Sequence, residues 1–329
     1  GKSVRGFGEI MKFSLIMPAY NSEKTIAESI DTLIAQTYPG WELIVVNDGS
    51  TDSTLDIVNK YSAEDGRIRV FSQENSGTAV ANNFGISQAN GDFITVFPSD
   101  DWLMPDYLQE FKDHIELAPG YDIYFANGWM KFEDGSEVKI ITEDLLDREP
   151  TFAQIIKTCP CSLGAMVKKG VHDSVGWYRK ERYTEDYDFW LRAADKHKRL
   201  YFFDKALVKV RLSATQKSAN KMALFESDLA IMRELLAGEG HSDKEVAALK
   251  DRISYIELLK SGKLEKEAEI NREMGRQLDI SAQKFSAFVE RIVGSKNAPK
   301  VLKVLHGVTF LVRPLRIIFY RLKAMQKNR

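Results

Sequence analysis

Short apolar runs alternate with helical patterns through the first hundred residues of the chain. The apolar runs span 13–17, 42–46, 68–71 and 93–97, and helical patterns fill about 23–36, 53–61 and 79–89 between them. A repeat of strand, helix and strand is typical of a mostly parallel sheet with helices on both faces. The pattern therefore predicts a Rossmann-like α/β fold for this part of the chain.

The pattern changes in the second half. Strand-like segments span 122–127, 129–132, 138–141, 164–168 and 200–210, with one helix over 187–196. After Lys217 the predicted helices span 222–236, 243–260 and 264–288, and Gly238, Gly240 and Ser261-Gly262 separate them. We expect this last stretch to form a helical C-terminal region.

Polar residues gather where each predicted strand of the first half ends. These polar loops are residues 18–21, 47–52, 74–77 and 98–101. Because ligands of parallel α/β sheets bind at the carboxyl ends of the strands, we expect the four loops to line one crevice. The first loop reads Pro-Ala-Tyr-Asn and lacks the Gly-x-Gly-x-x-Gly pattern, which argues against a nicotinamide-dependent dehydrogenase.

Composition narrows the class of protein. The 329 residues are 44% hydrophobic and carry a net charge of -1, which argues against a general nucleic-acid binder. The two cysteines, Cys159 and Cys161, are too few for a disulfide framework and suit a reducing compartment. We find neither an apolar stretch long enough to span a membrane nor a signal peptide, and we expect a cytoplasmic protein.

Two adjacent carboxylates, Asp100 and Asp101, follow the apolar run that ends at Phe97. Ionised carboxylates beside a core are costly unless a positive group faces them, so a divalent cation with its phosphates is the natural partner. A structural alternative is that both acids cap a helix beginning at Trp102.

Five motifs in the first two thirds of the chain occur in a distinctive order. They are Met-Pro-Ala-Tyr-Asn at 17–21, Val-Val-Asn-Asp-Gly-Ser-Thr-Asp at 45–52, Asn-x-Gly followed by Ala-x-Asn-x-Gly at 75–85, Ser-Asp-Asp-Trp-Leu at 99–103 and Thr-Glu-Asp-Tyr-Asp-Phe-Trp-Leu-Arg at 184–192. On these motifs, residues 13 to about 218 resemble the inverting nucleotide-sugar glycosyltransferases of family 2. The resemblance implies a GT-A fold and a nucleotide-sugar donor.

The resemblance also implies which residues hold the donor. Pro18, Ala19 and Tyr20 would wrap the nucleotide base, and Asp48 would accept from a ring N–H, which uracil usually supplies. The remaining donor contacts would come from Asn21, Asn75, Gly77, Asn83, Ser99, Asp100 and Arg211. Asp100 matches the second metal-binding aspartate of the family, which holds Mn²⁺ or Mg²⁺ between the donor phosphates, and hard oxygen ligands suit such a cation.

The acidic pair Glu185 and Asp186 resembles the pair that supplies the catalytic base of the family. An inverting transfer needs one carboxylate to take the proton of the acceptor hydroxyl, and we assign that role to Asp186. Glu185 either orients the acceptor or only favours the positive N-terminus of the following helix. Trp177 and Tyr178 precede the pair and are candidates for stacking on an acceptor sugar.

Three positions depart from the family pattern. Pro98 stands where the family has the first aspartate of the metal motif, Ser213 stands where it often has a histidine, and Asn82 stands where an arginine commonly contacts the base. Phosphate binding would then shift to Arg211, Lys217 or Ser218. These departures keep open an alternative function, a weak or inactive sugar-nucleotide-binding module that acts as an assembly partner.

The end of the chain is basic and amphipathic. After Glu290 there are ten Lys or Arg residues and no acid, so residues 1–290 carry about -11. We expect residues 299–329 to bind an anionic membrane surface, which suits a lipid-linked glycan acceptor at the inner face of the cell membrane. The alternative is packing against the helical region or another subunit, as in a homo-oligomer.

The sequence thus predicts four segments. Residues 1–10 are a leader or an expression remnant, and residues 11–218 form the GT-A domain, with a nucleotide-binding half at 11–105 and an acceptor half at 106–218. Residues 219–295 form the helical region, and residues 296–329 form the basic tail. The expected activity is metal-dependent transfer of a hexosyl or N-acetylhexosaminyl group to a cell-surface glycan or its lipid-linked precursor.

Overall fold

The computed structural model describes residues 10–132, 135–141, 146–158, 164–212, 217 and 220–261. The chain divides into two compact units, Gly1–Leu249 and Lys250–Arg329. The first unit holds the whole sheet. The described part of the second unit is the end of the last helix.

The described residues contain nine strands and nine helices. The strands are β1 (Phe13–Ala19), β2 (Trp41–Asp48), β3 (Ile68–Gln73), β4 (Phe93–Val96), β5 (Trp102–Leu103), β6 (Ile123–Lys131), β7 (Glu137–Lys139), β8 (Met166–Lys168) and β9 (Leu200–Arg211). The helices are α1 (Ile26–Ile34), α2 (Thr54–Glu64), α3 (Thr78–Ser87), α4 (Tyr107–Leu117), α5 (Phe152–Thr158), α6 (Val171–Val175), α7 (Glu185–Asp195), α8 (Lys221–Ala237) and α9 (Asp243–Lys260).

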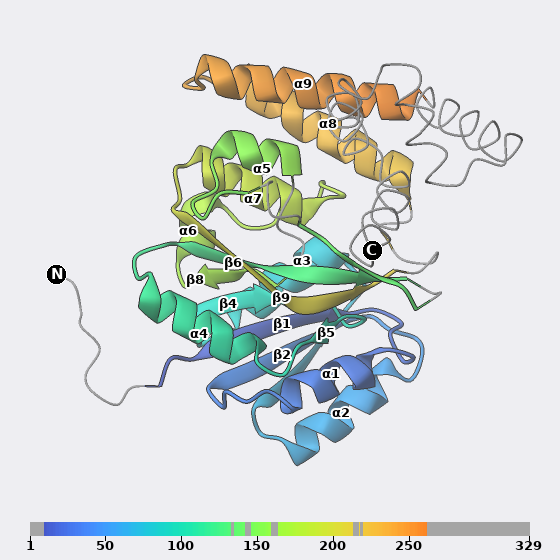
Figure 1. The fold of residues 1–329 in the computed structure, drawn as a ribbon. Helices are drawn as coiled ribbons and strands as arrows, with labels where there is room; N and C mark the ends of the chain where they lie inside the picture. Colours follow the sequence, from blue (N-terminus) through green and yellow to red (C-terminus); the bar gives the residue numbers. More distant parts are fainter. Residues whose placement is uncertain are drawn as a thin grey trace, which may run out of the picture. The chain divides into compact units, whose positions relative to one another are not determined.

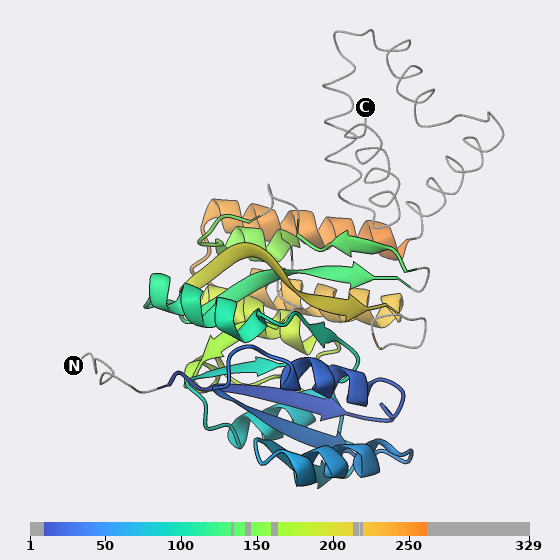
Figure 2. The same ribbon diagram turned by 60° about the horizontal axis from the view of Figure 1, so that its bottom comes forward.

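All nine strands belong to one sheet of order β3-β2-β1-β4-β8-β6-β9-β5, with β7 paired to β6. The β1 strand is parallel to both β2 and β4, and Figure 2 shows β1 and β2 side by side. The β8 strand is antiparallel to its neighbours β4 and β6, so β6 and β9 again run in the direction of β1. The carboxyl ends of β1, β2, β3, β4 and β9 therefore lie at one edge of the sheet.

Helices cover both faces of this sheet (Figure 1). The alternation of side chains along β1 and β2 decides which helix covers which face. Phe13, Leu15 and Met17 share a core with side chains of α1, α2 and α4. On the opposite face α3 approaches so closely that a Cβ on Gly85 would lie 2.4 Å from Ile16 Cγ2, which explains the glycine.

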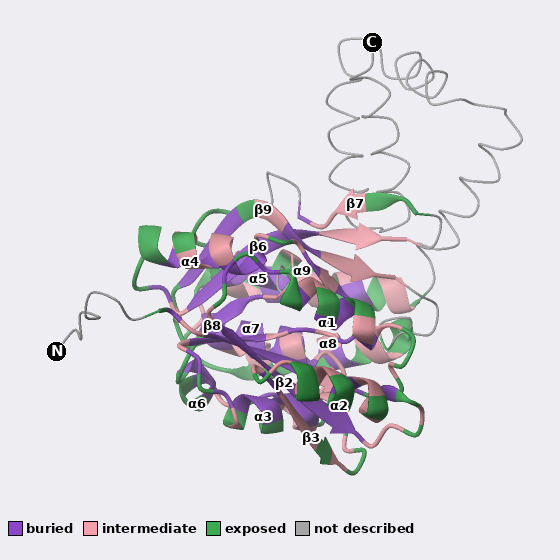
Figure 3. Ribbon diagram, turned by 90° about the horizontal axis from the view of Figure 1, so that it is seen from below, coloured by how far each residue is buried: buried purple, intermediate pink, exposed green. Residues whose placement is uncertain are grey.

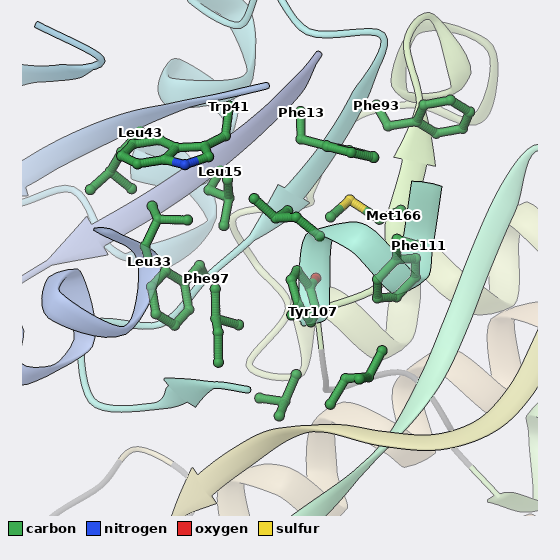
Figure 4. Close-up of a cluster of buried hydrophobic side chains, with 14 of the residues drawn as sticks. Phe13, Leu15, Leu33, Trp41, Leu43, Phe93, Phe97, Tyr107, Phe111 and Met166 are labelled. Atoms are coloured by element: carbon green, nitrogen blue, oxygen red, sulfur yellow. The ribbon is translucent and has the colours of Figure 1, made fainter. Parts of the chain in front are cut away.

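The core on the α1 side contains large apolar side chains from distant parts of the sequence. Figure 4 shows Phe13, Phe93, Tyr107, Phe111 and Met166 together in this cluster. The strands β1 and β2 are buried along nearly their whole length, as Figure 3 shows. Burial on both faces explains why these strands read as mostly apolar runs and not as alternating patterns. The polar residues Ser14 and Glu42 within these runs are buried and hydrogen-bonded to each other at 2.7 Å.

The predicted fold class is confirmed: the sheet is mostly parallel, helices cover both faces, and a helical region follows. The alternative in which Asp100 and Asp101 cap a helix is wrong. Residues Trp102–Leu103 form the strand β5, which pairs with Val208 and Lys209, and the next helix begins at Tyr107. The predicted strands 122–127 and 129–132 are one continuous strand, β6.

Candidate active site

The loops after β1 and β2 brace each other at the carboxyl edge. Asn21 adopts a positive φ of 49°, a conformation that asparagine tolerates, and its backbone N–H donates to Ser50 Oγ at 3.0 Å. In return the Thr51 N–H donates to Asn21 Oδ1 at 2.9 Å. The Asn21 side chain therefore shapes the loops, while its neighbour Tyr20 is 52% exposed beside them.

Asp48, at the end of β2, holds the loop that leads to α3. Its Oδ1 accepts from Gln73 Nε2 at 2.7 Å and from the Ser76 N–H at 2.9 Å, and its Oδ2 accepts from the Gly77 N–H at 2.9 Å. An ionised carboxylate offers about four acceptor positions, so these three donors leave one. Asp48 is buried, and it fixes the backbone of the loop that leads to α3.

The loop between β3 and α3 combines exposed and buried polar groups. Asn75 and Gly77 are exposed, and Gly77 has a φ of 90° with open space where a Cβ would lie. Asn82, on the first turns of α3, is buried, and its Oδ1 has no hydrogen-bond partner among the described residues. Because a buried acceptor without a donor is costly, Asn82 is a position where a ligand or water would complete the bonding.

Asn83 is committed to the protein backbone. Its Nδ2 donates to the Tyr178 carbonyl at 2.8 Å, and its Oδ1 accepts from the Tyr178 N–H at 3.0 Å. This pairing joins α3 to the loop before α7. Asn83 was predicted to bind the donor, and the structure shows its amide holding this loop.

The loop after β4 carries Ser99, Asp100 and Asp101. Ser99 Oγ lies 2.8 Å from Ser22 Oγ, which ties this loop to the loop after β1. Asp101 is buried, and its Oδ1 accepts from the Arg211 N–H at 3.0 Å. Burial and the charge of Asp100 raise the pKa of Asp101 well above its ordinary value. Asp101 thus anchors the end of β9, and Asp100 is the partly exposed carboxylate of the two.

The guanidinium of Arg211 is directed toward α1. Its Nη2 lies 2.6 Å from Glu28 Oε2, its Nε donates to the Asp100 carbonyl at 3.1 Å, and it stacks 4.0 Å from the Trp102 ring. Arg211 was predicted to bind phosphate, and in the structure its side chain instead links the backbone of Asp100 to Glu28 on α1. Ser213, one of the departures from the family pattern, and Ser218, another predicted phosphate-binding residue, lie outside the described residues.

The acidic pair forms the first turn of α7. Glu185 is 7% exposed, and its Oε2 lies 2.5 Å from Lys217 Nζ. Burial and the charge of Asp186 raise the pKa of Glu185, and Lys217 opposes that rise. Asp186 Oδ1 accepts from the Tyr187 N–H at 2.8 Å, and burial raises the pKa of this carboxyl as well. A carboxylate with a raised pKa is suited to accept a proton near neutral pH.

A buried carboxylate of α7, Asp188, is held by two arginines. Asp188 is fully buried, and Arg179 and Arg192 both bind its carboxylate. Arg192 also donates to the carbonyls of Val175, Gly176 and Trp177. Our sequence reading missed this cluster, although the i,i+4 spacing of Asp188 and Arg192 was a signal for an ion pair.

The helix α8 fastens the start of α7. The Thr184 N–H donates to Ser227 Oγ at 3.1 Å, and Thr184 Oγ1 donates to Asp228 Oδ1 at 2.9 Å. Arg179 adds an ion pair to Glu234 at 2.6 Å. The first helix of the predicted helical region therefore supports the acidic pair directly.

Aromatic side chains surround the loop before α7. Tyr178 is buried, and burial together with the charges of Asp186 and Glu185 raises the pKa of its hydroxyl. Trp177 is 36% exposed, and its backbone is held by Arg192. Trp177 therefore remains a candidate for contact with an acceptor sugar, whereas the Tyr178 ring is packed against His172 and Phe189.

The sequence was compared with known proteins, and so was the fold. The family described as "Glycosyl transferase family 2" matches residues 14–175. The chain is 34% identical to the putative glycosyltransferase EpsE of Bacillus subtilis (strain 168) over 206 residues, which are 61% of this chain and 73% of EpsE. It is 42% identical to the putative glycosyltransferase EpsH of the same organism over 121 residues, 37% of this chain and 35% of EpsH, so it spans only about a third of that relative.

Among solved structures, S. aureus TarS 1-349 in complex with UDP superposes with a TM-score of 0.57 at 25% identity. The match covers 85% of this chain and 78% of that one. A mostly parallel sheet with polar loops at its carboxyl edge and an acidic pair at the start of α7 defines a GT-A glycosyltransferase. The chain belongs to glycosyltransferase family 2.

Proposed function

We propose that this glycosyltransferase is an inverting enzyme that moves a sugar from a nucleotide-diphosphate donor to a hydroxyl of a cell-surface glycan or a lipid-linked glycan precursor. The observation that carries this proposal is Asp186, a carboxylate with a raised pKa. One of its oxygens accepts the backbone N–H of Tyr187, and no side chain of the described residues donates a hydrogen bond to it. Such a group is free to receive a proton.

The reaction needs one proton transfer and one displacement. Asp186 takes the proton of the acceptor hydroxyl while the acceptor oxygen forms a bond to the anomeric carbon. The bond from that carbon to the diphosphate oxygen breaks, and the nucleoside diphosphate leaves with the electron pair. The attack comes from the face opposite the diphosphate, which inverts the anomeric configuration. We assign to Glu185 a role in orienting the acceptor.

A uridine donor is the simplest choice. Asp48 retains one acceptor position for a ring N–H, beside Pro18, Ala19 and the exposed Tyr20. TarS, with which the fold superposes, has been solved in complex with UDP. We propose that Asn21, Asn75, Gly77 and Ser99 complete the donor site through the loops that they shape.

A divalent cation fits the loop after β4. The described residues contain no group of three His, Cys, Asp or Glu side chains that could hold a metal ion by themselves. Asp100 offers a partly exposed carboxylate there, so donor phosphates and water would supply the other ligands, as Mg²⁺ and Mn²⁺ sites at phosphates usually require. When bound, the cation offsets the charge that builds on the leaving diphosphate. Pro98 cannot contribute a ligand.

We also propose where this enzyme acts, at the cytoplasmic surface of the cell membrane. No helix among the described residues is long and apolar enough to cross a membrane. The basic segment 299–329 lies outside the described residues, and its binding to an anionic membrane surface at the cytoplasmic side stays a prediction. Assembly of a homo-oligomer through the helical region also stays a prediction.

The deciding experiment measures release of the nucleoside diphosphate from a panel of donors with an acceptor lysate, with and without Mn²⁺. D186N should abolish turnover while donor binding, measured by calorimetry, persists. D173N is a matched control because Asp173 is an exposed acid on α6, and it should keep full activity. Turnover that survives in D186N would contradict the assignment of the base.

A second candidate function is a weak or inactive sugar-nucleotide-binding module. The observation that favours it is the set of departures around the donor: Pro98, the buried Asn82 without a hydrogen-bond partner for Oδ1 among the described residues, and Arg211 bound to Glu28. Donor binding without turnover of any donor would support this function.

A further inference from the structure

The two carboxylates of the acidic pair have different partners. Glu185 is nearly fully buried and forms an ion pair with Lys217 at 2.5 Å. Asp186 is half-buried, and its carboxylate accepts only the backbone N–H of Tyr187 from the described residues outside its own backbone. Adjacent acids of one motif are therefore not equivalent in the folded protein.

Two carboxylates side by side in a buried site cannot both ionise cheaply, and they tend to share one proton. A cation on one of them removes most of this repulsion. Lys217 provides such a cation to Glu185, so the charge that Glu185 presents to Asp186 is largely offset.

We propose that Lys217 is a positioning residue that assigns separate roles to the two acids: by binding Glu185 as an ion pair, it leaves Asp186 as the acid that takes the acceptor proton. This inference rests on the proposed function. It adds a residue outside the motifs of the family, and it explains why the base is the second acid of the pair and not the first.

Tyr183 contacts both the backbone and the ammonium group of Lys217. Tyr183, in the loop before α7, donates its hydroxyl to the Lys217 carbonyl at 2.6 Å. The Lys217 ammonium also lies 4.9 Å from the centre of the Tyr183 ring. The backbone and the side chain of Lys217 are thus both held by the segment that carries the acidic pair. These contacts orient Lys217 for its ion pair with Glu185.

The other charged and titratable groups around the pair leave this role to Lys217. In the preceding loop Tyr178 is buried, and burial together with the charges of Asp186 and Glu185 raises the pKa of its hydroxyl. From α8, Asp228 is bound to Thr184, and within α7 Asp188 is bound to Arg179 and Arg192. Lys217 is the cation whose attraction lowers the pKa values of both Glu185 and Asp186.

The first test is independent of activity. The full chain, labelled with ¹³C at its Asp and Glu carboxyls, is titrated by NMR as wild type, K217M and K217R, with D186N and E185Q for assignment. K217M should raise the apparent pKa of Asp186 by about one unit, the size expected for loss of a nearby charge, and K217R should restore it. K112M removes a surface ion pair of similar length, Lys112 with Glu116 at 2.7 Å, and should leave the titration unchanged.

The second test follows the pH dependence of kcat. The acid limb of K217M should move to higher pH by about one unit, which is about a tenfold loss of rate on that limb. In an E185Q background the same substitution should shift the limb by less than half as much, because Glu185 no longer carries a charge to offset.

Three results would overturn the proposal: an unchanged Asp186 titration in K217M, a rate loss without a shift of the acid limb, or an equal shift with and without E185Q. The last result would mean that Lys217 acts on Asp186 by direct attraction alone and not through Glu185. If the wild type turns over no donor, the proposed function fails while the NMR titration still decides the role of Lys217.

Discussion

The side-chain amide of Asn83 pairs with the backbone of Tyr178 in both directions, at 2.8 and 3.0 Å. The two residues are far apart in sequence, and their pairing joins α3 to the loop before the acidic pair. Asn83 belongs to the Ala-x-Asn-x-Gly motif. Its position in that motif is thus explained by a structural contact within the protein.

Removing the Asn83 amide should therefore act on stability. N83A leaves a partly buried N–H and carbonyl of Tyr178 without partners, and we expect the free energy of unfolding to fall by about 1–3 kcal/mol in urea titrations. N75A is the matched control: Asn75 is exposed, so its stability should change by less than about 0.5 kcal/mol while the donor KM rises. Equal stability of N83A and wild type would show that the pairing contributes little.

Substitutions of the two acids after β4 should have different effects, on metal binding for Asp100 and on stability for Asp101. D100N should weaken Mn²⁺ binding in the presence of UDP by about tenfold or more, measured by EPR, with little change in Tm. D101A should instead lower the free energy of unfolding by about 1–3 kcal/mol, because the Arg211 N–H loses its acceptor. If D101A abolished metal binding while the fold stayed intact, the assignment of the two acids would be reversed.

His172 should make the protein sensitive to acid. It is 3% exposed, both ring nitrogens lack partners among the described residues, and burial, with the charge of Arg192, lowers its pKa to about 4. The unfolded chain binds this proton near the ordinary pKa of 6.5, so stability is lost as pH falls from about 6.5 to 4. The loss is about 3 kcal/mol.

The variant H172F tests this pH dependence. The imidazole stacks on Phe189 at 4.8 Å, and a phenyl ring can keep that contact without a titrating group. Urea titrations at pH 7 and pH 4.5 should show a smaller difference for H172F than for wild type. H197N removes an exposed histidine and should keep the wild-type difference. An undiminished acid loss in H172F would assign the effect to other groups.

Asp188 should be among the most sensitive polar positions. Its side chain is fully buried between Arg179 and Arg192, and D188N would take the counter-charge from Arg192 and leave Arg179 with its exposed partner Glu234. We expect a loss of about 3–5 kcal/mol in the free energy of unfolding. The exposed D173N is again the matched control and should change stability by less than about 0.5 kcal/mol. A mild effect of D188N would mean that the carbonyl contacts of Arg192 suffice.

The basic tail remains a prediction from the sequence. Deleting residues 299–329 should release the protein from anionic liposomes in sedimentation assays, because about 1 kcal/mol of attraction per basic residue is lost. Soluble donor hydrolysis should persist. An insoluble or unfolded deletion variant would favour packing of the tail on the protein.

The sequence predicted the parallel half of the fold well. The buried strands β1 and β2 read as apolar runs, and the helices between them had clear periodicity. The helices α4, α5 and α6 were missed. Two of these helices are short. The third, α4, begins at Tyr107, shortly after the two-residue strand β5, and the sequence alone allowed a helix that begins already at Trp102. Local sequence patterns do not reveal short helices that are stabilised mainly by packing against distant parts of the chain.

For the candidate site, too, the sequence indicated some features and not others. The motifs, through the resemblance to the family, indicated Asp48, Asp100 and Asp186, and the roles of these three acids stay predictions. The motifs did not indicate where each side chain points. Asn83 and Arg211 lie in the predicted loops, yet both are bound to protein groups, and only the three-dimensional contacts reveal this.

The attachment of α8 to Thr184 has a practical consequence for cutting the chain. A fragment that stops at residue 218, where the resemblance to the family ends, would retain every motif but lose Ser227 and Asp228. Thr184, which directly precedes the acidic pair, would then lose both of its side-chain partners from α8. The shortest fragment worth expressing therefore extends past Ala237, to the end of the first compact unit at Leu249.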